Sequence, residues 1–194
     1  MGRLLARMHG VGARARFRER GTIDTNTFIR DAARAVLASA LLPARLEAVY
    51  RARTDAIATS IDARFGALEP VARIRLHGDC HAGNVLWTDS GPHFVDLDDA
   101  RTGPAVQDLW MLAPSGRALA ALLEGYAEFR DFDVRELALV EPLRLMRQIH
   151  WAGWVAARWH DPAFPRAFGY VGEPRWWEQH LNDLAEALAG LDGD

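Results

Sequence analysis

The stretch RLHGDCHAGNVLW, residues 75–87, decides how the fold of this chain is interpreted. It places two histidines, an aspartate and an asparagine within a few positions, directly after an alternation of arginine and apolar residues. A second polar stretch, FVDLDDA at residues 94–100, puts three acidic residues at the end of an apolar run. Such residues either hold a metal ion for hydrolysis or position a nucleotide's magnesium and a hydroxyl group for phosphoryl transfer.

Apolar spacing around these stretches predicts a chain of α+β class that is mainly helical and has one small β-hairpin carrying the polar cluster. Short strands are predicted over residues 72–76, 84–87 and 93–97, the last two joined by the turn sequence TDSGP. Helices are predicted over residues 4–10, 28–42, 46–65, 106–112, 117–129, 137–159 and 175–191. In the third of these helices, Val49 and Tyr50 are expected to lie on one buried stripe.

Composition narrows the possible classes of function. The chain has 194 residues, of which 49% are hydrophobic, and a formal net charge of −3, which fits one domain with a substantial core. So small a charge does not indicate a nucleic-acid partner, and no apolar run predicts a membrane span. The single cysteine, Cys80, excludes an internal disulfide and favours a cytoplasmic location. All 23 basic residues are arginines, so no lysine can form a Schiff base or clamp nucleotide phosphates.

Asp79, Asn84 and Asp96 carry the side chains that phosphoryl transfer requires. The reaction needs a carboxylate that orients the attacking hydroxyl and accepts its proton, and oxygen ligands that hold magnesium on the nucleotide phosphates. Asp79 suits the first role, and Asn84 and Asp96 suit the second, because Mg²⁺ prefers hard oxygen ligands. Their order is that of the kinase pattern H-x-D-x-x-x-x-N followed by the aspartate of D-F-G. The sequence therefore predicts a site that uses Mg²⁺ and ATP.

The stretches HGDCHAGNVLW, FVDLDDA and GPAVQDLWML together resemble the aminoglycoside phosphotransferase and choline kinase-like superfamily. Within it, the likeness is strongest to a bacterial serine/threonine protein kinase of the stress response. This resemblance implies a protein-kinase-like fold and ATP- and Mg²⁺-dependent phosphate transfer to a serine or threonine hydroxyl. It implies that Asp79 is the catalytic base and that Asn84 and Asp96 bind magnesium and nucleotide. The acceptor stays open between a protein and a small alcohol, such as an aminoglycoside or a choline-like molecule.

Neighbouring polar residues have mostly structural interpretations. We expect His77 to be packed and hydrogen-bonded in the core. His81 is expected either to stabilise the loop or to approach phosphate. Asp108, just before an apolar run, is expected to accept backbone N–H bonds and so hold the catalytic loop. Cys80 lies beside the predicted base but lacks a clear activating arrangement, so it is weak evidence for redox sensing.

Two other classes of function stay open. The His-x-Asp-x-His pattern of residues 77–81, completed by Asp96 and Asp98, fits a metallohydrolase. Against it, ligands on neighbouring strand positions point to opposite faces unless a loop brings them together. Asp98 or Asp99 can instead pair with Arg101. The third possibility is a pseudokinase that binds partners without catalysis.

The first 76 residues predict helices and contain neither the Gly-rich strand–turn–strand nor the lysine of a kinase N-terminal lobe. We therefore expect residues 1–194 to be a single kinase-like C-terminal lobe, truncated so that the N-terminal nucleotide-clamping lobe is absent. Its catalytic loop and metal-binding segment are expected at residues 75–112. Such a lobe is expected to expose an apolar face, to self-associate or need the missing lobe as a partner, and to turn over little alone.

Overall fold

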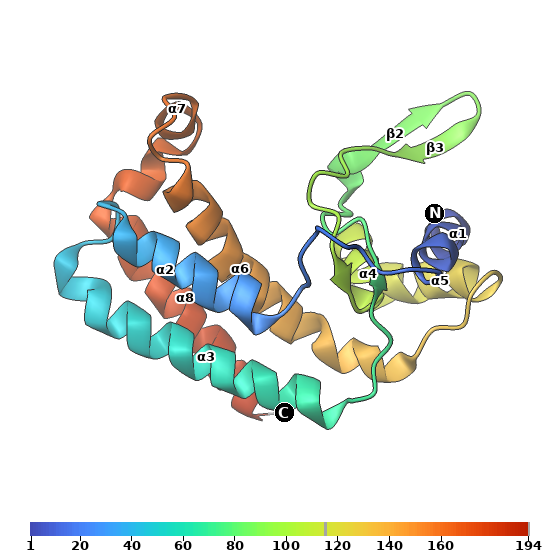
Figure 1. Ribbon diagram of the computed structural model, residues 1–194, viewed down its shortest axis with the longest axis horizontal. Helices are drawn as coiled ribbons and strands as arrows, with labels where there is room; N and C mark the ends of the chain where they lie inside the picture. The colour runs from blue at the N-terminus through green and yellow to red at the C-terminus, as the bar shows by residue number, and fades with distance from the viewer. Residues whose placement is uncertain (115, 194) are drawn as a thin grey trace. The chain divides into compact units, whose positions relative to one another are not determined.

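The computed structural model describes residues 1–114 and 116–193, and the chain divides into two compact units (Figure 1). The first unit comprises residues 1–23 and 68–140, and the second comprises residues 24–67 and those from 141 onward. Both polar stretches identified in the sequence belong to the first unit. The second unit is built from helices.

The first unit combines helices with short strands. Its elements are α1 (Gly2–Gly12), β1 (Ile74–Arg75), the 3₁₀ turn η3 (Ala82–Asn84), β2 (Val85–Thr88), β3 (Gly91–Phe94), β4 (Thr102–Gly103), α4 (Val106–Leu112), α5 (Gly116–Ala127) and the 3₁₀ helix η4 (Val134–Leu139). Helix α1 packs along α5, and a Cβ atom at Gly2 would clash with the carbonyl oxygen of Leu122. A buried cluster beneath them contains Leu5, Ala6, Cys80, Leu109, Ala113, Leu122 and Tyr126. The two polar stretches are thus attached to a packed helical base.

The strands form two small antiparallel pairs. In one, β1 pairs with β4 and aligns Ile74 with Gly103. In the other, β2 pairs with β3 and aligns Val85 with Phe94, which makes the hairpin that projects beyond the helices of this unit (Figure 1). The β1–β4 pair thus joins the two ends of the segment that holds the predicted site, and the β2–β3 hairpin lies within that segment.

The second unit is a set of packed helices. Its elements are the π-helical turn η1 (Asn26–Arg30), α2 (Asp31–Ala38), the 3₁₀ turn η2 (Ala44–Leu46), α3 (Glu47–Ala67), α6 (Val140–Ala157), α7 (Ala163–Phe168), the 3₁₀ turn η5 (Gly169–Gly172) and α8 (Pro174–Gly193). Helix α3 contacts both α2 and α8. Gly153 of α6 lies so close to Ala32 of α2 that a Cβ atom there would clash with its backbone. The fully buried residues of this unit include Ile29, Val36, Tyr50, Ile57, Ile61, Ile149, Val155, Trp177 and Leu184.

The structure confirms the helix-rich pattern with a hairpin and corrects several details. The second hairpin strand was predicted over residues 93–97, but β3 ends at Phe94 because the backbone turns into a left-handed conformation at Asp96 (φ 61°). Val49 is 45% exposed and does not share the buried stripe of Tyr50. The six-residue α7 and the two-residue β4 were not predicted, since neither is long enough to show a period. Among the described residues, no helix has the length and apolar content needed to cross a membrane.

Candidate active site

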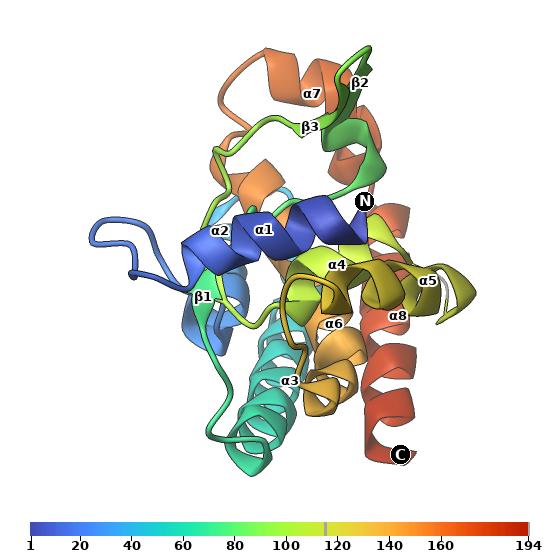
Figure 2. The same cartoon turned by 90° about the vertical axis from the view of Figure 1, so that its right-hand side faces the viewer.

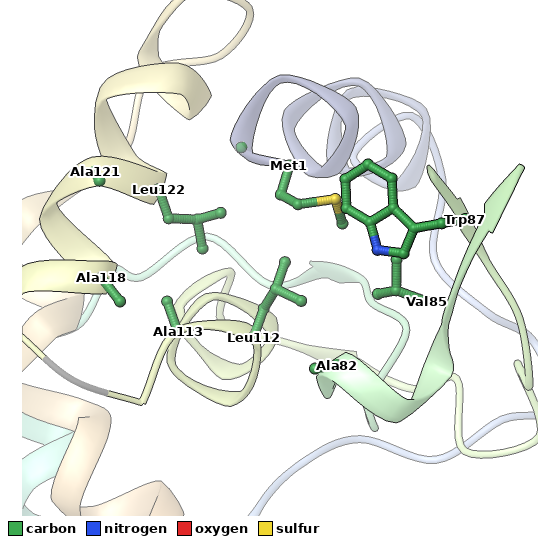
Figure 3. Close-up of a pocket in the computed structure, with 10 residues that line it drawn as sticks. Met1, Ala82, Val85, Trp87, Leu112, Ala113, Ala118, Ala121 and Leu122 are labelled. Carbon is green, nitrogen blue, oxygen red and sulfur yellow. The ribbon is translucent and has the colours of Figure 1, made fainter. Parts of the chain in front are cut away.

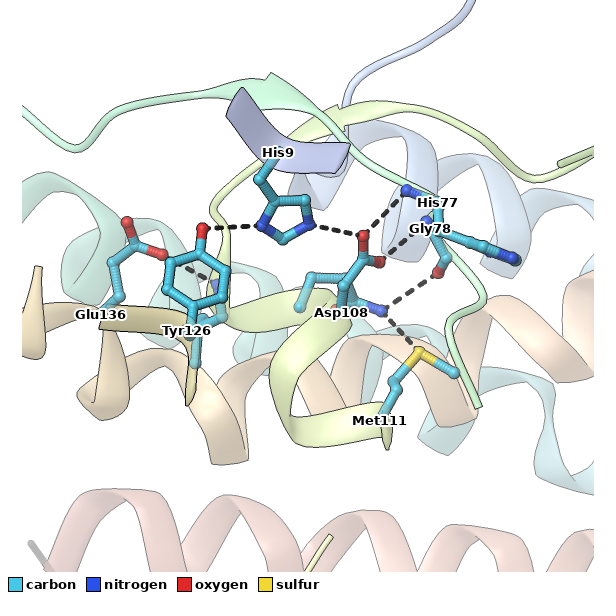
Figure 4. A network of polar contacts seen from close by, with 9 residues as sticks. His9, His77, Gly78, Asp108, Met111, Tyr126 and Glu136 are labelled. Carbon is cyan, nitrogen blue, oxygen red and sulfur yellow. Dashed lines mark hydrogen bonds and ion pairs between the residues drawn. The ribbon is translucent and has the colours of Figure 1, made fainter. Parts of the chain in front are cut away.

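The loop at residues 77–84, which contains Asp79 and Asn84, is held by a carboxylate from α4. Asp108 Oδ2 accepts a hydrogen bond from the backbone N–H of His77 (2.8 Å), and Oδ1 accepts one from Gly78 (2.9 Å), as Figure 4 shows. Asp108 is fully buried. Both of its oxygens therefore fix the backbone immediately before Asp79, and the predicted structural role of Asp108 is confirmed.

The buried charge of Asp108 has a third partner in α1. His9 Nε2 lies 3.0 Å from Asp108 Oδ2 and must donate, because a carboxylate can only accept. His9 Nδ1 lies 2.9 Å from the hydroxyl oxygen of Tyr126 in α5. All three side chains are fully buried. Burial raises the pKa of Tyr126 to about 12, so its hydroxyl keeps its proton at neutral pH.

Helix α4 is itself held at its first turn by Glu136 of η4. The backbone N–H of Val106 donates to Glu136 Oε2 (2.9 Å), and the Gln107 amide donates to the carbonyl oxygen of Gly78 (3.3 Å). Burial raises the pKa of Glu136 to about 7, against the lowering effect of the bond from Val106. Helix α4 thus contacts the loop through Asp108 and through Gln107, and the buried Glu136 binds a backbone N–H at its N-terminal end (Figure 4).

Gly78 allows the loop to follow this path. Its φ of 86° is a conformation that side chains rarely adopt, and a Cβ atom there would clash with the carbonyl oxygen of Asp99. The 77–84 loop therefore lies directly against the segment that follows Asp96.

Asp79 and Asn84 are joined within the loop. The Asn84 amide nitrogen donates to the backbone oxygen of Asp79 (2.9 Å), and Asn84 is only 9% exposed. This bond uses the amide nitrogen of Asn84, so Oδ1 is the atom of the amide that could bind a metal ion. The Asp79 carboxylate lies 3.6 Å from His81 Nε2, and its side chain is 18% exposed. It is thus accessible at the loop surface, and its role as base stays a prediction.

Asp96 is connected to the same loop through its neighbour Val95. The backbone N–H of Val95 donates to Asn84 O (3.0 Å), and Val95 O lies 2.8 Å from His77 Nε2. Asp96 is exposed and has a left-handed backbone, which aspartate tolerates better than most residues. Its role in metal binding also stays a prediction.

The other polar residues of the cluster have structural contacts. His77 is fully buried and hydrogen-bonded to Val95 O, which confirms its expected packing role. His81 Nδ1 accepts from the backbone N–H of Gly83 (3.0 Å), so His81 stabilises the loop. Arg101 lies 4.0 Å from Asp99, and this is the expected ion pair. Cys80 is buried, and burial, with the charges of Asp108 and Asp79, raises the pKa of its thiol.

The residues present fit a magnesium ion better than a hydrolytic metal centre. An amide oxygen and a carboxylate are hard ligands, which Mg²⁺ accepts while keeping several waters. Among the described residues, no three His, Cys, Asp or Glu side chains are grouped to hold a metal. The metallohydrolase interpretation therefore gains no geometric support.

An apolar cavity of about 390 Å³ adjoins the loop (Figure 3). Ala82 of the loop and Val85 and Trp87 of β2 line it, together with Met1, Gly2 and side chains of α4 and α5. Trp87 is 70% exposed and Leu86 54%, so the hairpin also presents apolar surface to solvent. The cavity has no titratable side chain among its lining residues and supplies no group for phosphoryl chemistry.

Sequence reasoning did not identify His9, Tyr126 or Glu136 as part of this arrangement. Each lies on a separate element and reaches the site only through the tertiary fold. The one available signal was for His9, a polar residue on the apolar face of α1.

Comparisons with known proteins show the family to which this chain belongs. The family model described as "Phosphotransferase enzyme family" matches residues 1–140, and the chain belongs to that family. Stress response kinase A of Escherichia coli (strain K12) is 43% identical over 193 residues, which cover 96% of this chain and 58% of that protein. Serine/threonine protein kinase RdoA of Salmonella typhimurium is 39% identical over 191 residues, which cover 96% of this chain and 57% of that protein. The chain thus spans less than two thirds of the length of these relatives.

Solved structures support the fold. A choline/ethanolamine kinase family protein from Mesorhizobium loti superposes with a TM-score of 0.63 at 18% identity, covering 100% of this chain and 65% of that one. A microcompartment-associated aminopropanol kinase gives a TM-score of 0.62 at 16% identity, covering 97% and 58%. Both likenesses confirm the predicted kinase-like fold class.

Proposed function

We propose that the first unit carries the catalytic loop of an ATP- and Mg²⁺-dependent kinase that phosphorylates serine or threonine in a protein. One observation carries this proposal. The Asp108 carboxylate accepts two backbone hydrogen bonds, from His77 and Gly78, and these hold the loop that contains Asp79 and Asn84. Relatives named as kinases support the activity, and one of them is named a serine/threonine protein kinase.

In this mechanism, Asp79 orients the acceptor hydroxyl and takes its proton. A bond forms between the hydroxyl oxygen and the γ-phosphorus of ATP while the bond to the bridging oxygen of ADP breaks. Magnesium, when bound, neutralises charge on the phosphates. Asn84 Oδ1 and the Asp96 carboxylate would hold it. The contribution of Asp108 and His9 is to keep the loop in one position, since positioning supplies much of catalysis in phosphoryl transfer.

Paired substitutions test these roles. The chain is joined to the part of the Escherichia coli relative that it does not match, and ³²P transfer from ATP to mixed protein, to an aminoglycoside and to choline is measured. Asp79→Asn is expected to lower the rate by about 10²–10⁴ while leaving nucleotide binding intact. Asp96→Asn is expected to weaken Mg²⁺·ATP binding as well, as measured by calorimetry.

Asp89→Asn is the matched control, because Asp89 is an exposed carboxylate in the hairpin turn. It is expected to leave both rate and binding unchanged. An Asp79→Asn protein with full activity would exclude Asp79 as the base. Transfer to the aminoglycoside or choline but not to protein would assign a small-molecule kinase instead.

A further inference from the structure

A basic segment, ARARFRER at residues 13–20, follows α1 and leads to the short pairing of Thr22 with Thr102. Figure 2 shows it as the dark blue loop that leaves the end of α1 beside β1. The basic segment contains four arginines and one acidic residue, Glu19, whereas the whole chain has a net charge of −3. It is therefore a local concentration of positive charge on an acidic protein.

Two contacts anchor the basic segment. Arg20 Nη1 donates to the carbonyl oxygens of Leu97 (2.8 Å) and Asp98 (2.7 Å). Two guanidinium groups lie over the Phe17 ring, with Cζ of Arg20 5.9 Å and Cζ of Arg75 5.6 Å from the ring centroid. Cation–π contacts at this distance are attractive. The segment is thus fixed against the residues that follow Asp96.

These anchors place the basic segment next to the candidate active site. The carbonyl groups that Arg20 binds belong to the two residues directly after Asp96. The next residue, Asp99, lies against Gly78, which precedes Asp79. A single stretch of backbone therefore separates the basic segment from the 77–84 loop.

The remaining arginines of the segment are available to a partner. Arg14, Arg16 and Arg18 are exposed, and their side chains form no ion pair or hydrogen bond with any residue that the structure describes. By contrast, Arg20 and Arg75 use their guanidinium groups on carbonyl oxygens and on Phe17. The basic segment thus contains arginines that anchor it and arginines that face solvent.

We propose that the basic segment is the docking surface for the phosphate acceptor, and that this acceptor is a peptide with acidic residues near its serine or threonine. The proposal rests on the proposed function. Carboxylates match the guanidinium fork, and like charges would repel an amine-bearing small alcohol. A nucleic acid is a poorer match, because the only aromatic ring of the segment, Phe17, is half-buried and already in contact with Arg20 and Arg75, which leaves less ring surface for stacking on bases.

Direct binding to the 194-residue chain tests the docking surface without requiring turnover. The probe is a labelled peptide whose central serine is flanked by glutamates, with a glutamine-flanked peptide as its neutral match, followed by fluorescence anisotropy. Arg14→Gln, Arg16→Gln and Arg18→Gln are combined in one variant. The matched control combines Arg117→Gln, Arg166→Gln and Arg175→Gln, which are exposed arginines elsewhere in the sequence. Both variants lose the same charge.

The acidic peptide is expected to bind more weakly as salt rises and about tenfold more weakly to the Arg14, Arg16 and Arg18 variant than to the control. Equal affinity for the two variants, or equal binding of the acidic and neutral peptides, would overturn the proposal. Single-stranded RNA that displaces the acidic peptide at far lower concentration would overturn it in favour of a nucleic-acid surface. Mg²⁺·ATP binding, measured in the same samples, reports separately on the proposed function, because none of these arginines contacts the 77–84 loop.

Discussion

The two units of this chain bury different kinds of side chain. In the first unit, His9, His77, Asn84, Asp108 and Glu136 are all buried and hydrogen-bonded around one loop. The second unit has a core of aliphatic and aromatic residues around Trp177, and its buried polar side chains among the described residues are two threonines and His180. Buried polar groups are costly when they lose their hydrogen-bond partners, so a set of hydrogen-bonded ones specifies one geometry more sharply than apolar packing does.

This difference indicates that the buried residues of the first unit mainly position the 77–84 loop, whereas those of the second unit mainly stabilise the fold. An apolar core tolerates small shifts, because many weak contacts are exchanged for others. A carboxylate that accepts two backbone N–H bonds tolerates almost no shift of the atoms that it binds, because hydrogen bonds depend on distance and direction. Substitutions in the two units should therefore separate loss of stability from loss of the site.

The largest effect is expected from Asp108→Asn compared with Ile57→Ala. The asparagine keeps the shape of Asp108 but turns an N–H donor toward a backbone N–H or toward His9, so we expect a loss of about 3–5 kcal/mol in unfolding free energy. Ile57, fully buried in α3, is expected to lose about 2–5 kcal/mol on truncation to alanine. Urea unfolding measures both losses.

The two variants should differ in Mg²⁺·ATP binding, measured by calorimetry on the fraction that remains folded. The Asp108 variant is expected to bind more weakly, because the backbone of the 77–84 loop is released. The Ile57 variant is expected to bind as the unchanged protein does. Equal losses of Mg²⁺·ATP binding in both variants would show that loss of stability, and not release of the 77–84 loop, weakens binding.

The next effect is a pair of opposite pH dependences. Burial raises the pKa of Glu136 to about 7, so its contribution to stability is present at low pH and is lost as pH rises from about 4.5 to about 7. Burial lowers the pKa of His180 to about 4, so its contribution is present above pH 6.5 and is lost as pH falls toward 4. Each shift corresponds to about 3 kcal/mol, and the two slopes nearly cancel between pH 4.5 and 6.5.

Removing either group should expose the slope of the other. In Glu136→Gln, the unfolding free energy is expected to rise between pH 4.5 and 6.5, because of this pair only the His180 shift remains. In His180→Leu it is expected to fall between pH 4.5 and 7, because of this pair only the Glu136 shift remains. Denaturant titrations across this range measure both slopes, and parallel curves for the two variants would contradict the assignment.

The smallest effects come from two glycines. Gly78→Ala is expected to destabilise the protein by about 1–3 kcal/mol, because the backbone has a positive φ and Asp99 O occupies the space. Gly66→Ala, near the end of α3 with open space around it, is expected to stabilise by about 0.4–1 kcal/mol. Thermal unfolding measures both changes, and shifts of the midpoint temperature in the same direction for the two variants would contradict the prediction.

The sequence predicted the fold class and the placement of Asp79 and Asn84 in one loop because both depend on local patterns. Helical spacing marks α3 and α8, and the short separation of Asp79 from Asn84 forces them into one loop. The role of Asp108 was also predictable, since an acid before an apolar run often accepts backbone bonds. The links to His9, Tyr126 and Glu136 were not predictable, because they depend on how α1, α5 and η4 pack around α4.

Cys80 makes the motion of the site measurable. It is the only cysteine, it is fully buried between Asp79 and the core, and its thiol resists ionisation. A thiol reagent can therefore react only during transient openings of the 77–84 loop or of the buried cluster that contains Cys80, and the labelling rate relative to a free thiol gives the opening free energy. Cys80 is thus a natural single-site probe of how often this part of the first unit opens. Mass spectrometry can measure its labelling without any substitution.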